Sequence, residues 1–241
     1  MFKILSFTKV KNIKRKVDNQ LFHLLRLNYY RFIYGQNYPF AKNIEKLIYG
    51  WEKKKVKPDI PVNREEWDAQ YQTGKWSFLD KADELVRYKA IIDYIEYFKP
   101  GGVVLDVGCG DGILLKHYKP YRYAKYVGLD ISKAALDKLM PKADEKTKFI
   151  QVDAETYKPT ELYDVIVFNE TLYYFHDPLK VFQRYVESLN RSGLLIVSTY
   201  SKSVRAVAIL RKLKTQYNLV AEKHVGHGKK IWICSVFDCL Q

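Results

Sequence analysis

The stretch from Val103 to Gly112 constrains the fold more than any other part of this sequence. It reads Val-Val-Leu-Asp-Val-Gly-Cys-Gly-Asp-Gly, an apolar run followed by three alternating glycines. The apolar run predicts a buried strand. The glycines predict a tight turn whose backbone N–H groups lie open to a ligand at the start of the next helix. The stretch therefore predicts a strand–turn–helix unit of an α/β protein.

The aspartate near the end of this strand indicates the kind of ligand. Asp106 would repel a pyrophosphate, and Ile113 stands where the dinucleotide fingerprint G-x-G-x-x-G has its third glycine. A carboxylate here instead attracts a positively charged ligand. S-adenosylmethionine (SAM) fits, because it carries a sulfonium and an ammonium and has no phosphate. For this turn taken alone, a tight turn in another kind of α/β protein is the alternative.

Each of the next three apolar runs also ends in polar side chains. These ends are Asp130, Asp153 and the pair Asn169 and Glu170. Asp130 follows the glycine turn by about 20 residues, where a nucleotide-binding unit places a carboxylate that accepts from ribose hydroxyls. Asp153 can accept from an adenine amino group. Ligands bind at the carboxyl edge of an open parallel sheet, so we expect one nucleoside site there.

In these motifs the chain resembles the class I SAM-dependent methyltransferases. VLDVGCGDG resembles motif I, VGLD motif II, QVDAE motif III and YDVIVFNETLYYF motif IV. LNRSGLLIVSTY resembles the following turn and fifth strand, and we expect this strand to begin at Gly193. The resemblance covers residues 63–241. Through FNETLYYFHDP it extends to a bacterial subgroup with small-molecule, sugar-modifying and nodulation-factor N-methyltransferases. It implies an α/β fold with a Rossmann-like, doubly wound seven-stranded sheet, mostly parallel, with a C-terminal antiparallel hairpin.

The resemblance also implies which residues bind SAM. It places Asp106, Gly108 and Gly110 at the methionine end, together with Asn169. It assigns Asp130 to the binding of the ribose, and Asp153 with Ala154 to the binding of the adenine. Neighbours of these positions complete the expected contacts of the glycine turn and the second strand end, namely Cys109 and Ile131.

Two positions before the first strand are expected to join this site. Arg87, in the amphipathic helix expected over residues 83–98, can pair with the cofactor carboxylate; an exposed surface arginine is the alternative. Trp76 and Tyr71 lie where the superfamily often places an aromatic lid, although core packing is the stronger interpretation for either ring singly.

The acceptor side is expected just after the fourth strand. Methyl transfer requires alignment, exclusion of water and, for a hydroxyl acceptor, a base. His176 and Glu170 are the candidate bases, because each can accept a proton near neutral pH. Packing before the helix that Asp177 caps is the alternative for His176, and Tyr173 is expected to shape the pocket. No His, Cys and carboxylate cluster has metal-ligand spacing, so no metal is expected.

Positive charge is concentrated at the N-terminal end. The net charge is +14, and residues 1–60 hold 14 Lys and Arg against four acids, a net of +10. With a linker expected over residues 53–58, we predict a basic, aromatic-rich helical extension over residues 1–62 and a methyltransferase domain over 63–241. An apolar stripe beside these cations resembles a helix that lies on an anionic membrane surface. Packing on the domain or on a partner, as in a homodimer, is the stronger alternative. The stripe is Val10, Ile13, Val17, Leu21 and Leu24.

These features predict a SAM-dependent methyltransferase that acts on a hydroxyl or amine of a small molecule or glycan, with a sugar-type acceptor favoured. A cytoplasmic location is expected, with peripheral attachment at the inner face of the membrane as an option. The charge admits an RNA methyltransferase as an alternative, but the N/D-P-P-Y signature is absent, so nucleic acid is not the expected partner. A non-catalytic membrane-anchoring subunit would show eroded cofactor motifs, and these are intact.

Overall fold

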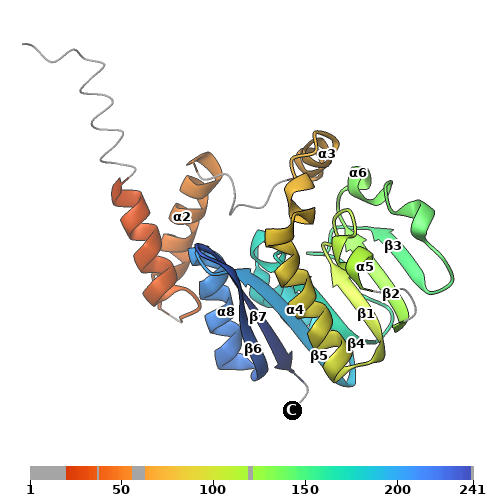
Figure 1. Cartoon of the computed structure of the whole chain (residues 1–241). Coiled ribbons are helices and arrows are strands. Elements are labelled where there is room, and N and C mark those ends of the chain that lie inside the picture. Colours follow the sequence, from red (N-terminus) through yellow and green to blue (C-terminus); the bar gives the residue numbers. More distant parts are fainter. Residues whose placement is uncertain (1–19, 37, 56–62, 119–121, 240–241) are drawn as a thin grey trace, which may run out of the picture. The chain divides into compact units, whose positions relative to one another are not determined.

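The chain forms two compact units, Met1–Ile60 and Pro61–Gln241, in a computed structural model (Figure 1). The structure describes residues 20–36, 38–55, 63–118 and 122–239. The larger unit holds a seven-stranded sheet and its covering helices.

The sheet of the larger unit has the order β3-β2-β1-β4-β5-β7-β6. β1 to β5 run parallel, whereas β7 is antiparallel to both β5 and β6. This confirms the predicted Rossmann-like sheet with a closing hairpin. The strands are β1 (Gly101–Val107), β2 (Tyr123–Asp130), β3 (Thr147–Gln151), β4 (Tyr163–Asn169), β5 (Leu189–Tyr200), β6 (Asn218–His227) and β7 (Lys230–Asp238).

Helices cover both faces of this sheet. Alternate residues of a strand point to opposite faces, and in β4 the side chain of Val167 joins the core beneath α4, whereas the ring of Phe168 packs on Phe182 and Tyr185 of α7. The sheet is therefore doubly wound, with α4 running across one face (Figure 1). The helices of this unit are α3 (Arg64–Gln72), η2 (Ser77–Asp80), α4 (Ala82–Phe98), α5 (Ile113–His117), α6 (Lys133–Leu136), η3 (Met140–Lys142), η4 (Leu172–Tyr174), α7 (Pro178–Val186) and α8 (Val204–Gln216).

Polar caps explain where four of these helices begin. The side chain of Asn63 accepts a hydrogen bond from the Glu66 amide at the start of α3, and Asp177 caps α7 as the sequence predicted. Ser132 and Ser203 do the same for α6 and α8. Each cap satisfies a backbone N–H that the first helical turn leaves without a partner.

Two predicted boundaries were wrong. The fifth strand was expected to begin at Gly193, but β5 begins at Leu189, which pairs with Tyr163 ahead of an irregularity in the ladder. The linker was expected to begin at Lys53, but α2 continues to Lys55, because lysines favour a helix. The rest of the expected linker, residues 56–58, lies outside the described residues.

The smaller unit is helical in its described part. A helix over residues 20–28 continues into the π-helical turn η1 (Tyr29–Ile33), and α2 (Ala41–Lys55) follows. Of the predicted apolar stripe, Leu21 and Leu24 lie in the first helix; Val10, Ile13 and Val17 lie outside the described residues. Within the described ranges, no helix combines the length and apolar character needed to cross a membrane.

Candidate active site at the carboxyl edge of the sheet

The glycine turn after β1 requires glycine for two separate reasons. Gly108 and Gly110 have φ of +76° and +56°, in the left-handed region that favours glycine. A Cβ atom on Gly108 would lie 2.4 Å from the Thr171 methyl carbon, and one on Gly110 would lie 2.5 Å from the Tyr71 hydroxyl oxygen. The turn is therefore closely covered by Thr171, which precedes η4, and by Tyr71 of α3. Cys109 is buried between the two glycines.

Asp130 holds the glycine turn from the neighbouring strand. Its Oδ2 accepts from the Gly110 amide at 2.8 Å, and its Oδ1 accepts from the Ser132 amide at 2.8 Å. Burial raises the pKa of Asp130 to about 6. Each carboxylate oxygen retains a second lone pair, so the group can still accept from ligand hydroxyls. Ile131 lies between these contacts and is partly buried.

Two buried polar atoms of the described residues have no hydrogen-bond partner. They are Nε of Arg87 and Oδ1 of Asp106. The other oxygen of Asp106 accepts from the Tyr126 hydroxyl at 2.6 Å, and burial raises the pKa of Asp106 to about 7. Leaving such atoms without a partner costs free energy, so they indicate a ligand that supplies one acceptor and one donor.

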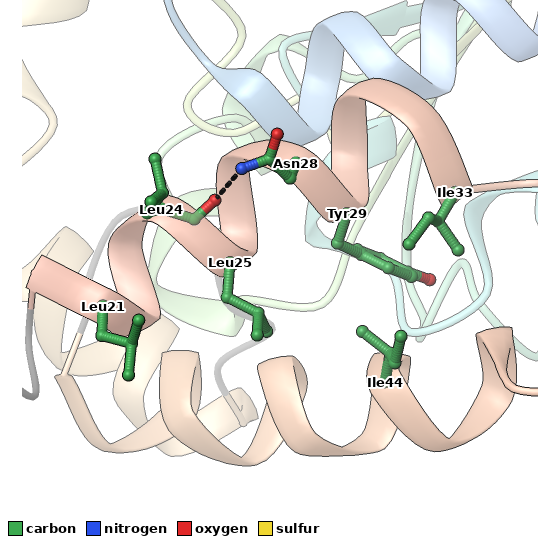
Figure 2. A pocket seen from close by; sticks show the side chains of 7 residues that line it. All are labelled: Leu21, Leu24, Leu25, Asn28, Tyr29, Ile33 and Ile44. Atoms are coloured by element: carbon green, nitrogen blue, oxygen red, sulfur yellow. Dashed lines mark hydrogen bonds between the residues drawn. The ribbon is translucent and has the colours of Figure 1, made fainter.

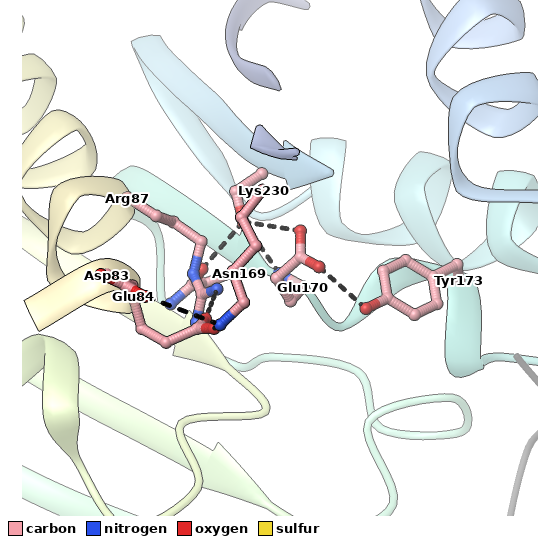
Figure 3. Close-up of polar contacts among 8 residues, drawn as sticks. Asp83, Glu84, Arg87, Asn169, Glu170, Tyr173 and Lys230 are labelled. Carbon is pink, nitrogen blue, oxygen red and sulfur yellow. Dashed lines mark hydrogen bonds and ion pairs between the residues drawn. The ribbon is translucent and has the colours of Figure 1, made fainter. Parts of the chain in front are cut away.

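Arg87 lies in a buried charged cluster at this edge (Figure 3). Its Nη1 donates to Glu84 Oε2 at 2.7 Å, and its guanidinium lies over the rings of Tyr88 and Trp232, with 4.6 and 5.2 Å to the ring centroids. Only 2% of Arg87 is exposed, which excludes the alternative of a surface arginine. Lys230 at the start of β7 pairs with the other oxygen of Glu84 at 3.5 Å.

The end of β4 brings Asn169 and Glu170 to the same cluster (Figure 3). Glu170 has φ +58°, a rare conformation for a residue with a side chain, and such strain gathers at functional sites. Its Oε2 accepts from the Tyr173 hydroxyl at 2.9 Å. Ser198 of β5 donates to Asn169 Oδ1 at 2.8 Å and accepts from the Glu170 amide at 3.0 Å. Burial raises the pKa of Glu170, while Arg87 acts in the opposite direction.

The remaining expected residues lie apart from this cluster. Asp153 is exposed in the turn after β3, where its Oδ1 accepts from the Glu155 amide at 2.8 Å. The buried Ala154 follows it, and its carbonyl accepts from the Tyr185 hydroxyl at 3.1 Å. His176 is exposed between η4 and α7. The structure thus brings Tyr173 to Glu170, but it does not bury His176 beside them.

Aromatic side chains of α3 meet those of η4. The ring of Trp67 lies 5.1 Å from that of Tyr174 and 5.4 Å from that of Trp76, centroid to centroid. Tyr71 is buried above the glycine turn, and Trp76 Nε1 donates to Gln70 Oε1 at 3.1 Å. α3 is therefore a cap whose rings join the glycine turn to the rim beyond β4.

A carboxylate of α3 also fixes this cap onto α6. Asp68 Oδ1 accepts from the Ser132 hydroxyl at 2.7 Å and from the Ala134 amide at 3.0 Å. Since the Ser132 amide donates to Asp130, the contacts run from the cap to the glycine turn through one serine.

Sequence reasoning missed several residues of this site, among them Asp68, Glu84, Tyr126 and Ser198. Ser198 had a usable signal, because β4 and β5 pair in parallel with Asn169 beside Ser198. Asp68 and Glu84 gave none, because helical carboxylates usually face solvent.

Comparisons with known proteins identify the family. A family model described as a methyltransferase domain matches residues 78–231, and the chain belongs to this family, which uses SAM. The match runs from η2, just before α4, to the start of β7, and it assigns this part of the chain to the methyltransferases.

Curated relatives match in part. A malonyl-acyl-carrier-protein O-methyltransferase 1 from Ilyobacter polytropus is 32% identical over 119 residues, covering 46% of this chain and 44% of that protein. A ubiquinone biosynthesis O-methyltransferase from Aliivibrio fischeri is 33% identical over 111 residues, covering 44% and 47%. The chain thus spans about half the length of the curated relatives that it matches.

A solved structure shows the same fold. The N-methyltransferase NodS from Bradyrhizobium japonicum, in complex with S-adenosyl-L-homocysteine, superposes with a TM-score of 0.64 at 17% identity, covering 72% of this chain and 96% of that one. The similarity confirms the Rossmann-like methyltransferase fold.

Proposed function

We propose that this protein transfers the methyl group of SAM to a hydroxyl or amine of a small molecule or glycan, with a sugar-type acceptor favoured. The observation that carries the proposal is the pair of buried polar atoms without a hydrogen-bond partner, Nε of Arg87 and Oδ1 of Asp106. A guanidinium N–H and a carboxylate oxygen complement the carboxylate and ammonium of an amino acid. When bound, SAM supplies an electrophilic methyl group and a neutral thioether leaving group.

The chain's own residues then have separate binding roles. Asp106, with Gly108, Gly110 and Asn169, holds the methionine end, and Arg87 receives its carboxylate. The ribose hydroxyls donate to Asp130. The adenine lies by Asp153 and Ala154, and Cys109, Ile131 and Trp76 line the same site.

Glu170 is the favoured base on the acceptor side. Its carboxylate is buried, hydrogen-bonded by Tyr173 and raised in pKa, which brings it towards the range in which it can accept a hydroxyl proton. His176 is the second candidate. The partly buried rings of Trp67, Trp76 and Tyr174 offer apolar faces of the kind on which sugar rings stack. Relatives whose names state O-methyl transfer favour an oxygen acceptor.

Calorimetry with SAM tests the cofactor site. Asp106→Ala and Asp130→Ala are each expected to weaken SAM binding by about 1–3 kcal/mol, the usual loss for a charge-assisted hydrogen bond. Asp93→Ala is the matched control, because Asp93 is an exposed aspartate of α4. NAD should not bind. Unchanged affinity in both site variants would overturn the assignment.

Release of S-adenosylhomocysteine with a panel of sugar and phenol acceptors tests the base. Glu170→Gln is expected to lower turnover by about 10²–10⁴-fold while SAM affinity changes little. His176→Gln serves as the matched comparison. A larger loss in the histidine variant would transfer the role to His176, and loss in neither would favour an amine acceptor that arrives neutral.

We also propose that the enzyme works in the cytoplasm, attached to the inner face of the membrane through its basic N-terminal unit.

A further inference from the structure

The N-terminal unit exposes large apolar side chains along its described helices. Leu21, Phe32 and Leu47 are 62%, 60% and 53% exposed, and Leu24 is 58% exposed. Phe40, at 49%, stacks on the ring of Tyr38 with 5.4 Å between centroids. Several large apolar side chains left exposed on one small helical unit are typical of an interaction surface.

Two of these side chains, Leu21 and Leu24, also line an apolar groove between the first helix and α2 (Figure 2). The groove has a volume of about 320 Å³. Leu21 and Leu25 point toward α2 from one side, and Ile44 faces them from the other (Figure 2). The lining residues are Leu21, Leu24, Leu25, Asn28, Tyr29, Ile33 and Ile44.

Exposed cations accompany this apolar surface. Arg31 lies over the ring of Phe32, 5.4 Å from its centroid, and Lys42, Lys46 and Leu47 are all exposed on α2. Over residues 20–55 the sequence has seven Lys and Arg against two acids. The combination of protruding apolar side chains, aromatic rings and cations is that of an interfacial helix.

We propose that this surface, defined as Leu21, Leu24, Arg31, Phe32, Lys42, Lys46 and Leu47, docks onto an anionic lipid bilayer. The charge favours this occupant over a second copy, because self-association would bring two units of net charge +10 together. Anionic headgroups neutralise the cations, while the leucine and phenylalanine side chains enter the acyl boundary. Lipid binding by this surface rests on the proposed membrane attachment and does not depend on methyl transfer.

Co-sedimentation of the full chain with vesicles tests the proposal. Vesicles of phosphatidylcholine with 30 mol% phosphatidylglycerol should bind the protein at 50 mM salt, and those of phosphatidylcholine alone should not. Neutralising three cations, in Arg31→Gln/Lys42→Gln/Lys46→Gln, should lower the partition constant on the order of 100-fold, at about fivefold per charge. Raising the salt to 0.5 M should release the wild-type protein, because the attraction is screened.

The apolar contribution has its own variant and control. Leu24→Ser/Phe32→Ser/Leu47→Ser should lose at least tenfold in partition at constant charge, since exposed leucine and phenylalanine contribute only if they enter the bilayer. Tyr97→Ser/Leu162→Ser, at two exposed positions of the larger unit, should bind as wild type. Circular dichroism monitors folding of each variant.

Two outcomes would overturn the proposal. One is wild-type protein that stays in the supernatant with anionic vesicles at 50 mM salt. The other is a concentration-dependent dimer, seen by sedimentation velocity, that the triple-serine variant abolishes while vesicle binding is unchanged; the surface would then be a contact between copies. Neither outcome bears on SAM binding, so failure here is distinguishable from failure of the proposed activity.

Discussion

At the scale of single residues, the site is defined by ionisable side chains that the fold itself buries. Asp106 gains one hydrogen bond from Tyr126 but loses its water, and burial raises its pKa to about 7. Arg87 keeps an unsatisfied Nε although Glu84 pairs with it. Folding thus leaves two buried hydrogen-bonding groups unsatisfied, and in the proposed complex the ammonium and carboxylate of SAM would offset that cost.

Asp106 predicts opposite pH dependences for stability and for cofactor binding. Between about pH 4 and 7 the folded state holds a proton on Asp106 that the unfolded chain releases, so this carboxyl makes the free energy of unfolding fall as pH rises. The cofactor ammonium instead requires the ionised form. SAM affinity should therefore weaken as pH falls below 7, approaching tenfold per pH unit.

Calorimetry at pH 6, 7 and 8 and urea unfolding at pH 5 and 8 measure the two effects. Asp106→Asn should bind SAM more weakly than wild type and with a flatter pH dependence, and its stability should fall less between pH 5 and 8. The pH dependence that remains in the Asp106→Asn variant is expected to come from Asp130, whose pKa is about 6. Equal pH profiles for the variant and the wild type would contradict the role of Asp106.

Sequence reasoning reached Asp106, Asp130 and Asn169 because each lies at a strand end, where chain direction alone decides which edge a side chain joins. It did not reach Tyr126 or Glu84. Tyr126 is one strand away in an apolar run, and its hydroxyl finds Asp106 only through the register of β1 and β2. Glu84 becomes interior only when β7 covers it, a contact of residues about 150 apart in sequence.

At the scale of elements, the cap α3 links the outside of the molecule to the glycine turn. Asp68 fixes α3 to the first turn of α6 through Ser132, and the Ser132 amide holds Asp130. Tyr71 of the same helix sits against Gly110. We infer that Asp68 is a positioning residue. It acts through Ser132 on Asp130, the carboxylate proposed to accept from the ribose hydroxyls.

Asp68→Ala is therefore expected to weaken SAM binding about three- to tenfold without reaching the cofactor itself. Asp68→Asn keeps an acceptor oxygen for the Ser132 hydroxyl and should restore most of the affinity. The double variant Asp68→Ala/Ser132→Ala should lose little more SAM affinity than whichever single variant binds SAM less tightly, because the two side chains act in one chain of contacts. Additive losses, or a loss explained by lower thermal stability alone, would remove Asp68 from this role.

The elements themselves were largely predictable, and their contacts were not. Alternating apolar runs and polar caps gave β1 to β5, the closing hairpin and the start of α7. The four-residue error at β5 arose because Leu189 already pairs with Tyr163 before the irregularity, whereas Gly193 gives the stronger local turn signal. Docking of α3 by Asp68 has no local signature, since its partners are 64 and 66 residues away.

At the scale of the whole molecule, charge and chemistry are divided between two units. The larger unit contains the seven-stranded sheet with a core on each face, together with every residue proposed for the reaction. The smaller unit carries most of the net positive charge, +10 of +14, together with the exposed apolar surface. If the two compact units perform the separate tasks proposed for them, binding of SAM and binding of lipid should be separable.

A protein truncated to residues 61–241 should test this separation. It is expected to bind SAM within about twofold of the full chain, because Arg87, Asp106 and Asp130 and their partners all lie in the larger unit. It should also lose partition onto anionic vesicles, since removing a net charge of +10 removes the main attraction. Calorimetry and co-sedimentation measure the two properties on one preparation. A truncated protein that is folded by circular dichroism yet fails to bind SAM would show that the N-terminal unit completes the cofactor site.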